Sequence, residues 1–142
     1  MSRVAFLLLL IFCSSAFAQS KKELKKFNIK SCTVTVTAID SSTGKEKIFT
    51  DSYNAYDKNG KMTEEKEYDR NGNFRKHECH KYNKNGSETE WTVFDAKGNI
   101  IRKTVTDYNS NNDKKTESIF DGTGTLIEKT QFNYNAEGVK TS

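Results

Sequence analysis

The stretch Tyr68-Asp69-Arg70-Asn71-Gly72-Asn73 decides the fold of this chain. The same unit, an aromatic residue followed by Asp or Asn, two further residues and a glycine, recurs almost to the C-terminus. The positions equivalent to Gly72 alternate in spacing between 12 and 14 residues, which is typical of a repeat architecture. These positions are Gly60, Gly72, Gly86, Gly98, Asn112, Gly124 and Gly138.

Each copy of the unit has the chemistry of a hairpin turn. Asp or Asn after the aromatic can accept a hydrogen bond from the backbone N–H two residues on, as in a type I turn. Glycine then adopts the left-handed conformation at little cost, and Asn, which replaces it at position 112, is the next-best residue there. A type I turn followed by a left-handed residue forms a three-residue hairpin loop. We therefore predict structural turn residues Asp57, Gly60, Asp69, Gly72, Gly86, Asp95, Gly98, Asn112, Asp121, Gly124 and Gly138.

Hairpin turns at every copy predict an all-β fold, an antiparallel meander of about eight strands. Residues 32–39 alternate with period two and are rich in β-branched side chains, as expected of a strand. Because long and short strands alternate and differ by two residues, the register shifts by two residues for each strand pair. This shift suits either a coiled open sheet or a small barrel. The predicted strands are 32–39, 47–53, 61–68, 73–82, 87–94, 99–108, 113–120 and 125–134.

The turns also predict which side chains face one another. In each loop the aromatic residue should pair with the residue two beyond the glycine, as Tyr68 with Phe74. The same register, continued without interruption, predicts a row across the opposite face as the best candidate for the buried side. That row contains Cys79, Trp91, Lys103, Ile119 and Ile127, with Val93 and Ile101 beside it.

The 142 residues amount to a single domain after an export signal. Residues 1–18 are typical of a signal peptide, with Arg3, an apolar run of nine residues and the cleavage sequence Ala16-Phe17-Ala18. The run is too short to span a bilayer, so we expect a chain that does not cross the membrane once cleaved near Ala18. The expected location is secreted, or periplasmic and associated with the cell envelope.

The exported part divides into a polar, basic lead-in and one β domain. Residues 19–31 form the lead-in, either a short helical turn or a flexible segment, and residues 32–142 form the domain. The charge of +4 comes largely from lysines in the lead-in, and we expect no nucleic-acid partner. Cys32 and Cys79 remain after cleavage, and in an oxidising compartment they form a possible disulfide.

The unit from Tyr68 to Asn73 resembles the YD repeat of RHS-type bacterial surface and toxin proteins. It is also similar to units in shorter exported bacterial repeat proteins, which Tyr56 to Lys61 and Phe94 to Asn99 match. The resemblance covers Tyr56 to Ser142. In large members such repeats build spiralling sheets that form a shell around a toxin domain, and this chain has too few copies for a shell. The resemblance implies a β-repeat scaffold that binds carbohydrate or protein, without family catalytic residues.

Little in the sequence points to enzymatic chemistry or to a cofactor. His77-Glu78-Cys79-His80 has metal-ligand residue types, but on a strand only His77 and Cys79 share a face. A metal site there would need help from another strand, because zinc usually takes at least three protein ligands. We therefore predict no metal, no cofactor and no catalytic residue.

The function that the sequence favours is an exported, non-enzymatic binding or adhesion module for a carbohydrate or protein ligand. Exposed aromatic rings on a rigid sheet can stack on sugars or anchor a protein. The candidate ligand contacts are Trp91, Tyr68, Tyr82 and Tyr108. One alternative is a structural envelope scaffold, which edge strands rich in Lys and Glu would oppose. Another is a small exported enzyme or an enzyme inhibitor.

Overall fold

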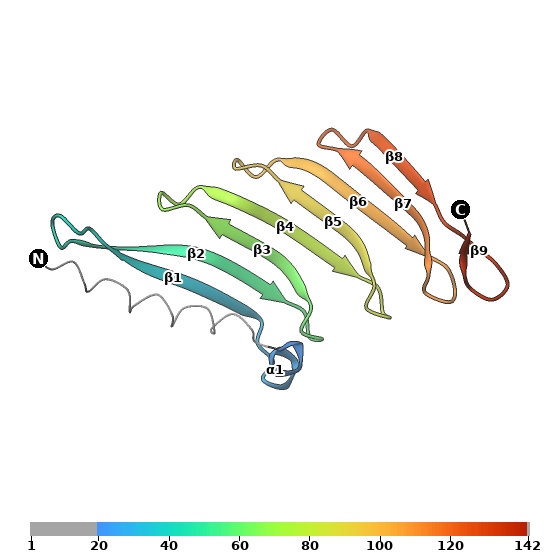
Figure 1. The fold of residues 1–142 in the computed structure, drawn as a ribbon, viewed down its shortest axis with the longest axis horizontal. Helices are drawn as coiled ribbons and strands as arrows, with labels where there is room; N and C mark the ends of the chain where they lie inside the picture. Colours follow the sequence, from blue (N-terminus) through green and yellow to red (C-terminus); the bar gives the residue numbers. More distant parts are fainter. Residues whose placement is uncertain (1–19, 142) are drawn as a thin grey trace, which may run out of the picture.

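The structure, a computed structural model, describes residues 20–141. The predicted signal peptide, residues 1–18, lies outside the described residues. The described chain is an antiparallel meander in which each strand pairs with the next, as Figure 1 shows. Its eight-stranded sheet contains β1 (Ser31–Ile39), β2 (Glu46–Tyr56), β3 (Met62–Tyr68), β4 (Phe74–Tyr82), β5 (Glu88–Phe94), β6 (Ile100–Tyr108), β7 (Lys114–Asp121) and β8 (Leu126–Gln131).

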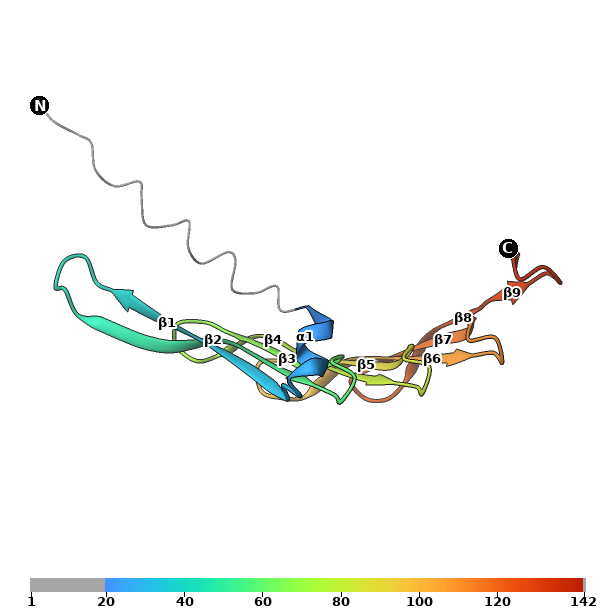
Figure 2. The same cartoon turned by 90° about the horizontal axis from the view of Figure 1, so that it is seen from below.

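The predicted fold class is confirmed, and the sheet is open rather than closed into a barrel. The last predicted strand, 125–134, is interrupted after β8. Beyond Phe132, whose N–H donates to Lys115, the short strands β9 (Asn133–Tyr134) and β10 (Lys140–Thr141) form a separate pair. Figure 2 shows the sheet edge-on as one thin, curved layer.

Because there is a single layer, almost no side chain is fully withdrawn from solvent. Among the described apolar residues, only Leu24 and Ile119 are less than 9% exposed. A core in the usual sense is therefore missing from residues 20–141, and cross-strand contacts within the layer take its place. The first strand of the sheet, β1, is an edge and contains no charged residue. The expectation that Lys and Glu protect the edges is wrong for this strand.

The hairpin turns have the predicted geometry. In the turn at Asp69, a carboxylate oxygen accepts the N–H groups of Asn71 at 2.8 Å and Asn73 at 2.9 Å, and Gly72 donates to the Asp69 carbonyl. All the residues predicted to be left-handed have positive φ, for example 85° at Gly72 and 66° at Asn112, and Asn28 and Gly44 are left-handed as well. Asn substitutes for Asp at several turns because an amide oxygen accepts the same bonds, as at Asn109.

Each aromatic residue pairs with the predicted partner, but the register beyond that pair is different. Tyr68 faces Phe74 and Tyr82 faces Glu88, as expected. The residue that follows this partner on the returning strand, such as Thr89 after Glu88, has no partner of its own, so every one of these hairpins contains a β-bulge.

The bulge reverses the faces, because one extra residue moves all later side chains of the strand to the other side. Cys79 therefore pairs with Thr92, and Trp91 pairs with His80. The predicted row is wrong: Cys79 and Lys103 lie on one face, Trp91 and Ile119 lie on the other, and Ile127 occupies a bulge. We call these the Cys79 face, which includes Glu64, Tyr68, Phe74, His77 and Phe94, and the Trp91 face, which includes Tyr82, Glu88, Thr104, Tyr108 and Ile119.

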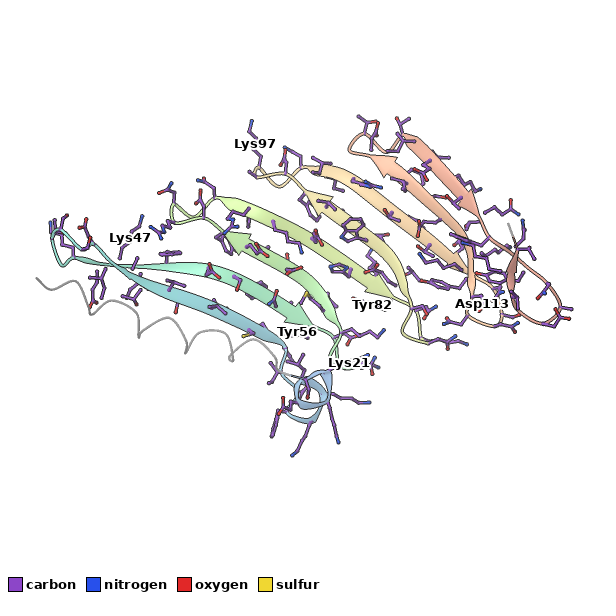
Figure 3. All side chains as sticks on the ribbon, in the orientation of Figure 1. Lys21, Lys47, Tyr56, Tyr82, Lys97 and Asp113 are labelled. Atoms are coloured by element: carbon purple, nitrogen blue, oxygen red, sulfur yellow. The ribbon has the colours of Figure 1, made fainter. Side chains whose placement is uncertain are left out.

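The two rows of turns are chemically different. At the end of the sheet where Tyr56 and Tyr82 are labelled in Figure 3, the turn aromatics are tyrosines on the Trp91 face. Three tyrosine hydroxyls at this end donate to a backbone carbonyl 20 residues earlier: Tyr82 to Met62 at 2.8 Å, Tyr108 to Glu88 at 2.7 Å and Tyr134 to Lys114 at 2.8 Å. This ladder links consecutive turns at that end.

The lead-in is helical for one and a half turns. The helix α1 (Lys21–Lys26) begins with a capping box in which Ser20 and Glu23 satisfy one another's backbone N–H groups. The S-x-x-E pattern of Ser20 to Glu23 is a sequence signal for this helix. Buried Leu24 contacts the first turn, where a Cβ atom built on Gly60 would lie 3.2 Å from the Leu24 Cβ. Gly60 therefore has two roles: it adopts the left-handed conformation of the turn, and its lack of a side chain leaves space for α1.

Two glycine substitutions distinguish the need for a left-handed backbone from the need for space beside α1. At Gly98 φ is 84° and nothing lies within 4 Å of an added Cβ, so Gly98→Ala should cost only the left-handed backbone, about 1–2 kcal/mol. Gly60→Ala should cost more, because its Cβ would lie 2.8 Å from the Lys21 carbonyl oxygen. Urea unfolding midpoints measure both, with Gly98→Asn as the tolerated control; equal losses at the two sites would contradict the role of Gly60 in seating α1.

The turn carboxylates should make the sheet sensitive to acid. The side-chain amide and then the backbone N–H of Asn99 lower the pKa of Asp95 below its ordinary value of 3.8. A lowered pKa stabilises the fold above pH 3.8, and that contribution is lost as the pH falls through the folded value. We expect carboxyl-carbon NMR to show Asp95 titrating below 3.8, and Asp95→Asn to unfold with a weaker acid dependence. An Asp95 midpoint at or above 3.8 would contradict this turn chemistry.

Candidate functional site

The Trp91 face is hollowed where β5, β6 and β7 run side by side. The hollow has a volume of about 280 Å³, just below the range of about 300–1,000 Å³ usual for small-molecule sites. It combines two aromatic side chains and one aliphatic side chain with charged and hydroxyl groups. Its lining residues are Glu88, Glu90, Trp91, Arg102, Thr104, Thr106, Tyr108, Lys114, Glu117 and Ile119.

Trp91 is held in place by the neighbouring strand. Its indole N–H donates to Glu78 at 3.0 Å, so one ring edge is fixed while the half-buried ring borders the hollow. Glu88 is in turn held at 2.6 Å by His80. The bond to Glu78 orients the indole ring before any ligand binds, which lowers the entropy lost on binding.

The charged groups around the hollow differ in availability. Lys114 pairs with Glu117 at 2.6 Å. Arg102, in contrast, makes no ion pair with any residue in the described range, so its guanidinium donors are available to a ligand. Thr104 and Thr106 also line the hollow, and the Thr104 hydroxyl oxygen is buried without a hydrogen-bond partner among residues 20–141. The hollow thus offers an apolar ring with hydrogen-bonding groups on its rim.

Only two of the four candidate ligand contacts meet at this hollow. Trp91 and Tyr108 both line it. Tyr82 shares the face, but its ring is covered by the Lys61 ammonium at 4.5 Å from the ring centroid. Tyr68 lies on the Cys79 face, where its ring lies 5.1 Å from that of Phe74. Tyr108 is also bonded through its hydroxyl to the Glu88 carbonyl, so it has a structural role beside any contact with a ligand.

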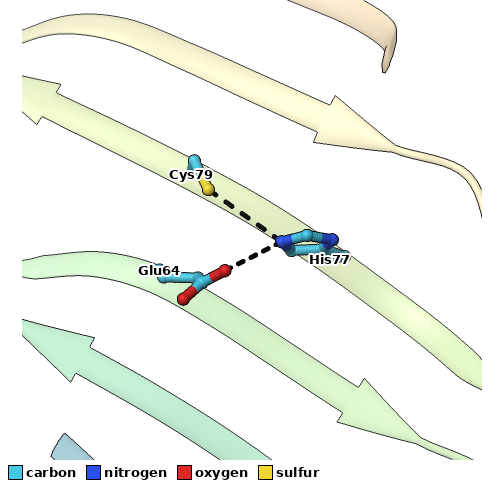
Figure 4. Close-up of side chains that lie close together, drawn as sticks. All are labelled: Glu64, His77 and Cys79. Atoms are coloured by element: carbon cyan, nitrogen blue, oxygen red, sulfur yellow. Dashed lines mark hydrogen bonds and ion pairs between the residues drawn. The ribbon is translucent and has the colours of Figure 1, made fainter. Parts of the chain in front are cut away.

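A second cluster, on the Cys79 face, brings together Glu64 from β3 with His77 and Cys79 from β4, as Figure 4 shows. The Nε2 atom of His77 lies 3.0 Å from Glu64 Oε1 and 4.0 Å from Cys79 Sγ. Sequence reasoning identified His77 and Cys79 as sharing a face but missed Glu64. The signal that would have found it is the bulged register, in which Glu64 pairs with Cys79 across the two strands.

The electrostatics of the cluster do not favour a nucleophilic cysteine. Burial and then the Glu64 charge raise the pKa of the Cys79 thiol, whereas a reactive cysteine has a lowered pKa. Burial acts to raise the pKa of Glu64, but hydrogen bonds from Lys66 and His77 outweigh it, so that pKa is lowered. The carboxylate is therefore ionised while the thiol stays protonated near neutral pH.

The fold separates the two cysteines that were considered for a disulfide. Cys32 lies on β1 and shares a face with Asn54, Glu65 and Glu78, the face opposite to that of Cys79. Three strand spacings of about 4.8 Å put β1 about 14 Å from β4, whereas a disulfide needs Cα atoms closer than about 7 Å. Both thiols are free, and this fold holds them too far apart for an intrachain bridge.

Residues 20–141 contain no helix of the length and apolar character needed to cross a membrane. No protein-family model matches the sequence, and no curated protein matches it either.

The hydroxyl of Tyr108 offers a direct test of the tyrosine ladder. Tyr108→Phe removes the bond to the Glu88 carbonyl and should destabilise the protein by about 0.5–1.5 kcal/mol. Tyr68→Phe is the matched control, because the Tyr68 hydroxyl bonds to no residue of the described chain, and its unfolding midpoint should not change. Chemical unfolding measures both; a stable Tyr108→Phe variant would contradict the ladder.

Proposed function

We propose that this chain is an exported, non-enzymatic β-repeat module of the YD-repeat kind that binds a carbohydrate in the hollow beside Trp91. The observation that supports this most is the combination, on one rigid face, of an oriented indole ring with free hydrogen-bond donors. A pyranose ring has an apolar C–H face and a rim of hydroxyls, so it needs both kinds of contact at once.

The size and composition of the hollow suit one or two sugar units. Its volume of about 280 Å³ leaves room for a small ring, and Arg102 and Glu88 line the same hollow as Trp91. The lining is too polar for a purely apolar ligand. Lys114 and Glu117, which line the hollow from β7, pair with each other and leave no strong net charge there. This favours a neutral ligand over a highly charged one.

The position of Trp91 in the repeat supports the same conclusion. Consecutive pairs of hairpins repeat every 26 residues, and the positions equivalent to Trp91 are Glu65 and Glu117. Tyr82 and Tyr108 are equivalent to one another and to Tyr56 and Tyr134, as expected of residues that build the sheet. Trp91 departs from the period, so the scaffold does not explain why a tryptophan stands there.

A structural scaffold is the second candidate, and the uncharged edge strand β1 favours it. The nine residues of β1, Ser31–Ile39, include no charged side chain of the kind that usually blocks pairing, and the strand's outer edge pairs with no other strand of the described sheet. A second chain or another copy could extend the sheet there by strand addition. In that case association, rather than the hollow, would be the function.

A glycan array with the purified protein tests the carbohydrate proposal. Trp91→Ala should weaken binding at least tenfold, equivalent to about 1.4 kcal/mol, because it removes the ring that the sugar stacks on. Tyr68→Ala, on the opposite face, is the matched control and should bind as the native protein does. Circular dichroism verifies that both variants are folded.

Two outcomes would decide against the hollow. Equal glycan retention by Trp91→Ala and the native protein would remove Trp91 from the binding site. No glycan retained by any form, together with concentration-dependent assembly in sedimentation, would favour the scaffold.

A further inference from the structure

We propose that Glu64, His77 and Cys79 form a zinc site on the Cys79 face. The site lies on the opposite side of the sheet from the Trp91 hollow and does not depend on the function proposed for it. Thiolate, imidazole and carboxylate are the three kinds of protein ligand that zinc takes, whereas calcium and magnesium take oxygen ligands. The three ligand atoms lie within 4.8 Å of one another.

The three groups converge on one point, which is the geometry of ligands around an ion. Glu64 Oε1 and Cys79 Sγ both approach the same imidazole nitrogen, Nε2 of His77, while Nδ1 is buried without a hydrogen-bond partner. A nucleophile–base–acid triad would use both nitrogens, one for the thiol and the other for the carboxylate. The cluster therefore has the arrangement of a coordination site rather than that of a proton relay.

The separations are close to those that zinc requires. Bonds of about 2.3 Å to sulfur and about 2.0–2.1 Å to nitrogen, at tetrahedral angles, put S and N about 3.6 Å apart and N and O about 3.3 Å apart. The observed separations are 4.0 Å for Cys79 Sγ to His77 Nε2 and 3.0 Å for Glu64 Oε1 to the same nitrogen. These two separations need to change by a few tenths of an ångström, and the Glu64 carboxylate and Cys79 thiol, whose ligand atoms lie within 4.8 Å, close around the ion by side-chain rotation.

The imidazole is already fixed in the orientation that the site needs. Its ring stacks on Phe94 at 4.3 Å and on Phe74 at 5.2 Å between ring centroids, which holds Nε2 toward β3. Lys66 pairs with the Glu64 oxygen at 2.7 Å and neutralises that carboxylate when no metal is bound. On binding, Lys66 gives up this oxygen and the Cys79 proton passes to solvent. Three protein ligands leave a fourth position for water.

The repeat shows that the scaffold does not require these residues. Twenty-six residues further on, the equivalents of Glu64, His77 and Cys79 are Glu90, Lys103 and Val105. There, Lys103 and Glu90 form an ordinary ion pair at 2.9 Å. A Glu–Lys pair thus serves the sheet in that copy, and the copy after it has Thr116, Lys129 and Gln131 at the equivalent positions. Neither copy combines a carboxylate, an imidazole and a thiol, as residues 64–79 do.

Cobalt binding to the reduced, purified protein tests the site, because Co²⁺ takes zinc ligands and reports a thiolate by charge-transfer absorption. We expect a thiolate-to-cobalt band that Zn²⁺ abolishes and Ca²⁺ does not. Cys79→Ser should lose the band, and Glu64→Gln should weaken Zn²⁺ binding at least tenfold in calorimetry. Cys32→Ser and His80→Gln, which change the same residue types on the Trp91 face, are matched controls that should bind as the native protein does.

His77→Lys keeps the test decisive if another ligand variant fails to fold. It recreates the Glu90–Lys103 pair of the next repeat, so circular dichroism should show a native sheet while Zn²⁺ binding is lost. The proposal is overturned if the native protein gives no thiolate–cobalt band, or if folded His77→Lys binds Zn²⁺ within twofold of the native affinity. Loss of the band in Cys32→Ser would overturn it as well.

Discussion

Each hairpin in this protein depends on one side-chain oxygen that accepts two backbone N–H groups. At Asp69 these come from Asn71 and Asn73, and the left-handed Gly72 lets the chain return beside itself. The turn sets the aromatic pair next to it, and the bulge that follows sets the face of every later residue on that strand. Because this unit is repeated, one local interaction determines the register of the sheet from β2 to β8.

The consequence of a single layer is that stability has to come from within the sheet. With Leu24 and Ile119 the only buried apolar side chains of residues 20–141, area burial contributes less than in a two-layer domain. Cross-strand pairs such as Lys76 with Glu65 at 2.7 Å contribute about 0.2–1 kcal/mol each. The tyrosine ladder adds bonds between hairpins rather than within one, so neighbouring repeats stabilise one another.

The sequence was sufficient to predict the turns, the strands and the aromatic pairs, because these depend on residues fewer than ten positions apart. It was insufficient for the faces. A bulge at Thr89 depends on how two strands twist together, and spacing does not encode that. The error placed Cys79 beside Trp91, and it concealed Glu64 as the neighbour of Cys79. Predicted ligand contacts were separated for the same reason, with Tyr68 on one face and Trp91 on the other.

The repeat itself distinguishes residues that build the sheet from residues that need another explanation. Tyr108 recurs with the period and binds a backbone carbonyl, so its presence follows from the architecture. Trp91 and His77 break the period: Trp91 lines the hollow on one face, and His77 lies beside Glu64 and Cys79 on the other. A single layer has no core to fill, so packing between elements does not explain why these two residues differ from their equivalents in the other repeats. The two proposed sites give these departures a role: carbohydrate binding for the indole on one face, and zinc binding for the thiol–imidazole–carboxylate cluster on the other.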